Sequence, residues 1–100
     1  MKESIILDLN SPVFQKDLFL LTKEEAFSLL STLRKISKMS WGEIYKDGGL
    51  KWELIYSKKG IKGENIYRFR INKKFRATAL REANSLRILS LHSDHDTTYK

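Results

Sequence analysis

Alternation of apolar and charged residues in the second half of the chain constrains the fold more than any other feature. In the segment IYRFRI, the apolar residues Tyr67, Phe69 and Ile71 alternate with two arginines, Arg68 and Arg70. Successive side chains of a β-strand point to opposite faces, so this segment is predicted to be a strand with one apolar face and one arginine face. Two arginines on one face of a strand stand about 7 Å apart, a spacing that suits successive phosphates.

Similar alternation flanks this strand on both sides. The segments LKWELIY, FRATALRE and SLRILSLH are predicted strands, joined by a Gly-bearing loop (KKGIKGEN), by NKK and by a tight turn at Ala83 and Asn84. Near the start of the chain, Ser4 to Leu9 is a predicted strand that ends at turn residues. The segment that follows, VFQKDLFLL, is compatible with either a helical turn or a strand.

Two capping-box patterns predict helices between these regions. Thr22 is followed three residues later by Glu25, and Ser40 by Glu43. In such a box the hydroxyl and the carboxylate each accept a hydrogen bond from a backbone amide that the first turn leaves unpaired. The first box precedes apolar residues at helical spacing, and the second precedes the short segment WGEIYK.

The order of these elements predicts a fold class. A chain of 100 residues is the usual size of one domain, so we expect a single domain over residues 1–100. We expect an α+β domain with an N-terminal strand and one or two helices packed on one face of a three- to four-stranded, mainly antiparallel sheet.

Positive charge is concentrated in one part of the chain. The formal net charge is +7. The segment from Lys51 to Arg81 holds ten Lys or Arg and two Glu, whereas the remaining residues hold nine basic and ten acidic side chains. This distribution favours a polyanionic or acidic partner over a charge that serves solubility alone. The lysines expected to bind or steer RNA are Lys58, Lys59, Lys62, Lys73 and Lys74.

Composition excludes several kinds of stabilising site and of targeting segment. The chain has no cysteine, so neither a disulfide nor a thiolate zinc site can hold the fold. No apolar run reaches the roughly 18 residues of a membrane span, and the N-terminus does not resemble a signal peptide. We therefore expect a cytoplasmic protein that has no membrane partner and needs no cofactor or metal.

Both histidines lie in the C-terminal stretch LHSDHDTTYK. Strand alternation places His92 with Ser90 and Ile88, which favours a structural role for His92. His95, with Tyr99 four residues later, is the better candidate for proton transfer, because histidine is the usual acid or base near neutral pH. A metal site in HSDHD is chemically conceivable but less favoured, since His92 and His95 would point to opposite faces if the strand continued.

In this half of the chain, the arginines, the histidine and the tyrosine, in their order along the sequence, resemble the pattern of the RelE/ParE superfamily of type II toxin–antitoxin systems. Members typically carry a strand with alternating basic residues, an aromatic–arginine pair that opens the next strand, and a terminal basic or histidine residue with a tyrosine after it. Arg68 and Arg70 match the alternating pair, Arg76 follows Phe75, and His95 and Tyr99 match the terminal pair. The resemblance covers residues 65–99 in motif and residues 20–99 in layout.

This resemblance implies a toxin that inhibits translation as a ribosome-dependent, metal-independent messenger-RNA endonuclease. Its partners would be messenger RNA, the ribosome with its 16S ribosomal RNA, and an acidic antitoxin protein. Arg68, Arg70 and Arg76 would clamp phosphate and stabilise the transition state, His95 would be the acid or base, and Tyr99 a stacking or relay partner. The alternative is a non-catalytic basic protein, either a ParE-like gyrase inhibitor or a module that binds RNA or an acidic protein.

Overall fold

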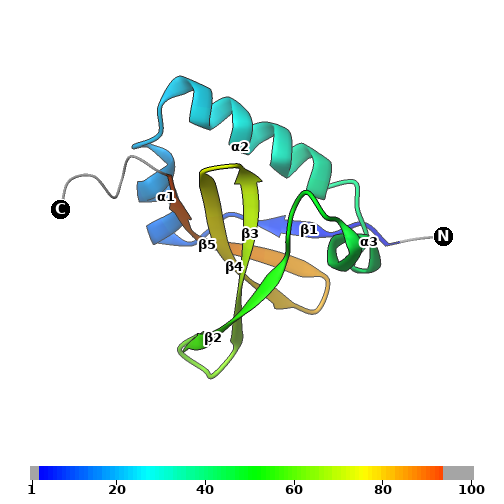
Figure 1. Ribbon diagram of the computed structural model, residues 1–100. Coiled ribbons are helices and arrows are strands. Elements are labelled where there is room, and N and C mark those ends of the chain that lie inside the picture. The colour runs from blue at the N-terminus through cyan, green and yellow to red at the C-terminus, as the bar shows by residue number, and fades with distance from the viewer. Residues whose placement is uncertain (1–2, 94–100) are drawn as a thin grey trace.

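The computed structural model describes residues 3–93, which form three helices and a five-stranded mixed sheet (Figure 1). In chain order the elements are β1 (Ile6–Asp8), α1 (Pro12–Leu18), α2 (Lys23–Ile36), α3 (Trp41–Lys46), β2 (Glu53–Lys59), β3 (Asn65–Asn72), β4 (Phe75–Glu82) and β5 (Ser85–His92). None of these helices is long and apolar enough to cross a membrane.

The sheet has the strand order β1-β5-β4-β3-β2. Strands β2 to β5 form an antiparallel meander, and β1 pairs in parallel with β5 at the far edge. The predicted α+β class is therefore confirmed, but the sheet is larger and more mixed than the three to four mainly antiparallel strands expected. The difference arises because the N-terminal strand joins the sheet, and local alternation does not indicate which strand will accept an edge partner.

Helix starts agree with the capping patterns. Both predicted boxes form, Thr22 with Glu25 at α2 and Ser40 with Glu43 at α3, each with its reciprocal pair of hydrogen bonds. The segment that the sequence left open is α1, with Ser11 as its N-cap and proline at the first turn. The molecule thus has three helices within residues 3–93, rather than the one or two expected.

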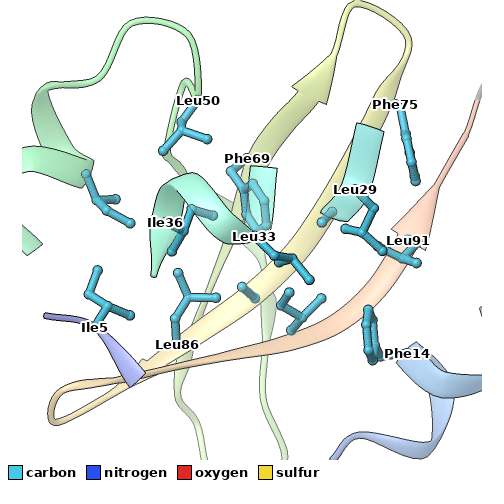
Figure 2. Packing of buried hydrophobic residues seen from close by; sticks show 14 of the residues in the cluster. Ile5, Phe14, Leu29, Leu33, Ile36, Leu50, Phe69, Phe75, Leu86 and Leu91 are labelled. Atoms are coloured by element: carbon cyan, nitrogen blue, oxygen red, sulfur yellow. The ribbon is translucent and has the colours of Figure 1, made fainter. Parts of the chain in front are cut away.

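The core lies between the helices and one face of the sheet (Figure 2). From α2, Leu29, Leu33 and Ile36 point toward Phe69 of β3 and Leu86 of β5 (Figure 2). Phe69, Ile36 and Leu86 are fully buried. Because the core takes the apolar side chains of β3, the arginines that alternate with them are left on the opposite, open face of the sheet.

A β-bulge in β5 changes which side chains face the core. Thr78 of β4 is opposite Ser90, and the next residue, Ala79, is opposite Ile88, so Leu89 is an extra residue in β5. Ile88 and Leu91 are both buried in the core although they are three positions apart. Beyond the bulge, Ser90 and the residues that alternate with it therefore lie on the open face.

Helix α1 covers the part of the β5 edge that the short strand β1 leaves unpaired. The Ser11 hydroxyl donates a hydrogen bond to the carbonyl of Leu89 at 3.3 Å, and the amide of Leu91 donates to the Asp17 carboxylate at 2.9 Å. These two side chains satisfy backbone groups beside the bulge that would otherwise be left without partners. The bulge is thus held in place by α1.

Strand β2 begins later than its sequence pattern suggests. The alternation starts at Leu50, but β2 starts at Glu53, and Leu50 to Lys51 form a turn in which Lys51 has a φ of 49°. Asp47 holds this turn, because its carboxylate accepts a hydrogen bond from the amide of Leu50 at 2.9 Å. The alternation of apolar and charged residues continues through this turn. The alternation therefore does not mark the residue at which strand pairing begins.

Candidate active site and nucleic-acid interface

The three arginines selected from the sequence meet on the open face of the sheet. Arg68, Arg70 and Arg76 line one hollow of about 280 Å³, together with Lys51 and Glu53. Four cationic side chains therefore surround one carboxylate. A small hollow with this lining is suited to an anion with several oxygen atoms, such as a phosphate.

Strand register explains the grouping. Arg70 is directly opposite Arg76 in the β3–β4 pair, and Arg68 is opposite Glu53 in the β2–β3 pair. Residues opposite each other in an antiparallel pair have side chains on the same face, with Cβ atoms about 5 Å apart. The register of Arg76, which its sequence leaves open, is fixed by the short β3–β4 connection.

Glu53 neutralises only part of this positive charge. Its carboxylate accepts a hydrogen bond from the Arg68 guanidinium at 2.8 Å, and this contact, with the charges of Arg68, Lys51 and Arg76, lowers the pKa of Glu53. A carboxylate in this position stays ionised at neutral pH and holds Arg68 in a fixed orientation.

Arg70 has a donor that the protein does not use. Its Nε is buried, and it has no hydrogen-bond partner among the residues that the structure describes. A buried donor without a partner costs about 1–3 kcal/mol, and an acceptor brought by a bound molecule would remove that cost. Arg76, by contrast, donates one hydrogen bond to the carbonyl of Lys73 at 3.1 Å.

His92 lies beside the arginines, on the face opposite to Ile88, with which strand alternation had grouped it. It is directly opposite Arg76 in the β4–β5 pair, so the open face carries Arg70, Arg76 and His92 in one row across three strands. The Nε2 atom of His92 is 2.8 Å from the Ser90 hydroxyl, which is in turn 2.5 Å from the Thr78 hydroxyl. A chain of two hydroxyls therefore holds the imidazole next to the arginine hollow.

The bulge accounts for the face on which His92 lies. Simple alternation groups His92 with Ile88, which faces the core, whereas the extra residue Leu89 turns His92 to the open face. Glu53 and Lys51 were also missed, although a signal was present. Both alternate with apolar residues in LKWELIY, and the same reasoning that placed Arg68 on the open face would have placed them there.

A larger groove continues from the arginine hollow along the open face. Its volume is about 840 Å³, and its lining includes the apolar side chains of Ile66, Leu80 and Leu89 together with Thr78, Ser90 and His92. Two elements border it. One is the β2–β3 hairpin, and the other is the start of α1 with the adjoining part of β5.

The predicted RNA-binding lysines divide between two places. Lys58, Lys59 and Lys62 line the groove, but Lys58 and Lys59 belong to the end of β2 rather than to the loop in which they were expected. The strand persists to the hairpin because β2 pairs with β3 as far as Lys59. Lys73 and Lys74 form the turn between β3 and β4, next to Arg76.

His95 and Tyr99 lie outside the described residues, so their predicted roles stay predictions. Within residues 3–93, no three His, Asp or Glu side chains come close enough together to hold a metal ion. Comparison of the chain with protein-family models, with curated proteins and with solved structures finds no match.

Proposed function

We propose that this protein is an endoribonuclease of the RelE type, the toxin of a toxin–antitoxin pair, which cleaves messenger RNA on the ribosome. The observation that carries the proposal is the row formed by Arg70, Arg76 and His92 on the open face of the sheet. Fixed positive charge lines one phosphate-sized hollow, and the imidazole of His92 is on the neighbouring strand, opposite Arg76.

These groups supply what cleavage of RNA requires. The 2′-oxygen attacks the adjacent phosphorus and loses its proton to a base, while the bond from phosphorus to the 5′-oxygen breaks and an acid protonates that oxygen. Arg70 and Arg76 would stabilise the charge that builds on the phosphorane, which a permanently charged guanidinium can do without a metal ion. Arg68, held by Glu53, completes the clamp.

Proton transfer is assigned to His92 in the first place. Its Nε2 contacts Ser90, which leaves Nδ1 to exchange a proton with the substrate. Glu53 is less suited to this task, because the arginines around it lower its pKa and weaken it as a base. His95 and Tyr99 keep the roles that the resemblance implies, as the second proton-transfer group and a stacking partner.

The proposed partners follow from charge. Messenger RNA and 16S ribosomal RNA are polyanions that suit the arginine hollow and the lysine-lined groove. An acidic antitoxin segment over the same surface would neutralise it and silence the enzyme.

Mapping of messenger-RNA 5′ ends after induction in a bacterial host tests the proposal. New ends within translated regions are expected for the wild type and are expected to disappear in Arg76→Ala. Replacing His92 by Gln should reduce cleavage by about 10²–10⁴-fold while RNA binding is retained. Induction without new ends would refute the endonuclease.

Variants at the two histidines separate the assignments. His95→Gln, made in parallel, shows which imidazole is required, and Arg34→Ala on the exposed side of α2 removes a cation away from the open face as a matched control. Filamentation with DNA damage would favour a gyrase inhibitor, and harmless expression would favour a non-catalytic binding module.

A further inference from the structure

Arg87 occupies the groove at the end opposite the arginine hollow. It belongs to β5, lines the groove, and is opposite Leu80 of β4. Arg76, in the hollow, is four residues before Leu80 on the same strand, which corresponds to about 13 Å along the sheet. Arg87 thus lies in the groove, and Arg76 lies in the hollow about 13 Å away.

The guanidinium of Arg87 is incompletely paired. Its Nε is buried without a hydrogen-bond partner among the described residues, and the nearest carboxylate oxygen, Oδ2 of Asp8, is 4.0 Å away. That distance allows weak charge attraction but no hydrogen bond. Asp8 therefore attracts Arg87 only weakly, and the Arg87 side chain, which is 37% exposed, can receive another acceptor.

Apolar side chains line the groove beside Arg87, and Leu80 is directly opposite Arg87 on the neighbouring strand. Ile66, Leu80 and Leu89 line this part of the groove, and Ile66 and Leu80 are buried. Nucleic-acid bases have apolar faces that pack on such surfaces, whereas phosphates require cations at the ends or sides. A segment of single-stranded RNA presents both features in alternation.

Charge along the groove agrees with a polyanionic occupant. Its lining contains the cations Lys58, Lys59, Lys62 and Arg87, against the carboxylates Glu64 and Glu82. The lysines border the same groove from the hairpin side, where they would contact a backbone that runs between the two arginine sites.

We propose that Arg87 is a second phosphate-binding site, which receives a phosphate of the RNA at least one nucleotide away from the phosphate held at Arg70 and Arg76. The base next to the phosphate at Arg87 lies on Ile66, Leu80 and Leu89. This inference rests on the proposed function, because it assumes that RNA is what binds at the arginine hollow. It predicts that the protein recognises a stretch of single-stranded RNA rather than a single phosphodiester.

Fluorescence anisotropy with labelled 2′-fluoro oligouridylates tests the second site. These oligonucleotides lack the 2′-hydroxyl and resist cleavage, so binding is measured whether or not the protein is an enzyme. The wild type should bind a tetranucleotide about tenfold more tightly than a dinucleotide at low salt, because the longer probe reaches Arg87. Arg87→Gln should lose this gain and keep the affinity for the dinucleotide.

Two further variants control for charge and folding. Arg34→Gln removes one positive charge from α2 and should retain the gain with length. Asp8→Asn keeps the oxygen that accepts from the amide of Asn10 but removes the charge that competes for Arg87. It should bind the tetranucleotide several-fold more tightly than the wild type and the dinucleotide equally.

The outcomes separate the two proposals. Equal affinities of Arg87→Gln and the wild type for the tetranucleotide would overturn the second site and leave the arginine hollow intact. Failure of the wild type to bind any of the oligonucleotides would overturn both. Loss of the gain in Arg87→Gln, with its increase in Asp8→Asn, would establish the second site even if no cleavage is observed.

Discussion

At the scale of single residues, Asp47 shows how one carboxylate closes a connection. It accepts a hydrogen bond from the amide of Leu50 and forms an ion pair with Lys35 of α2 at 3.0 Å. The Leu50 amide makes the largest contribution to lowering the pKa of Asp47, and Lys35 adds to it. The carboxylate thus ties α2 to the turn that precedes β2.

Asp47→Asn should lower the free energy of unfolding at pH 7 by about 0.5–1 kcal/mol, because the amide keeps an acceptor but loses the charge. The folded-state pKa of Asp47 is lowered, so its stabilisation is complete above the usual aspartate pKa and is lost as the pH falls through the folded value. Urea unfolding at several pH values measures this. A difference between the proteins that persists at pH 2 would contradict the assignment.

Individual site residues were predictable where alternation is unbroken. Arg68 and Arg70 follow directly from their apolar neighbours, and the structure brings them to one hollow with Arg76. His92 was misplaced because a bulge has no clear sequence signature, and one extra residue inverts the faces of everything after it.

At the scale of elements, α1 supports the end of β5 that carries His92. Asp17 accepts the hydrogen bond of the Leu91 amide, immediately before the histidine. Strand β1 pairs with β5 only as far as Arg87, so the rest of that edge depends on α1. The helix therefore positions a candidate catalytic side chain through the edge of the sheet, and its first residues also border the groove.

Asp17→Ala should destabilise the protein by about 1–3 kcal/mol, since the amide of Leu91 loses its partner in a partly buried place. Amide hydrogen exchange should accelerate at Leu91 more than at Phe69 in the centre of the sheet. Asp17→Asn retains an acceptor oxygen and should preserve most of the protection. Unchanged exchange at Leu91 in the alanine variant would show that α1 does not hold this edge.

The helices whose first residues are set by nearby capping residues were the easiest elements to predict. The capping boxes at Thr22 and Ser40 satisfy backbone groups within a few residues, and both helices begin where expected. The identity of α1 depends on its contacts with β5, far away in sequence, and VFQKDLFLL alone does not contain that information.

At the scale of the whole molecule, charge is divided between two sides of the sheet. The helices cover one face (Figure 1). The open face carries the arginine hollow and the lysine-lined groove. The net positive charge can be counted from the sequence. The grouping of the cations on one face could not be predicted, because it depends on the register of four strands. The parallel placement of β1 was not predictable, because no local pattern specifies a partner nearly 80 residues away.

The logarithm of the association constant for single-stranded RNA should fall linearly with the logarithm of the salt concentration, with a slope of about −0.7 for each phosphate contact. Arg76→Gln should reduce the slope by about 0.7, whereas Lys38→Gln at the end of α2 should leave it unchanged. Titrations at several salt concentrations measure both. Equal slopes for the wild type and Arg76→Gln would show that Arg76 does not contact a phosphate.

The pairing of β1 with β5 also fixes the order in which the chain can assemble. Ile6 is paired with Ser85, so the first strand cannot dock until the last one has been synthesised, and closing so long a loop is entropically costly. Arg87 and His92 belong to that last strand. A growing chain, or one broken off before β5, therefore has neither a complete sheet nor a complete site, and the proposed activity requires the last strand to be in place.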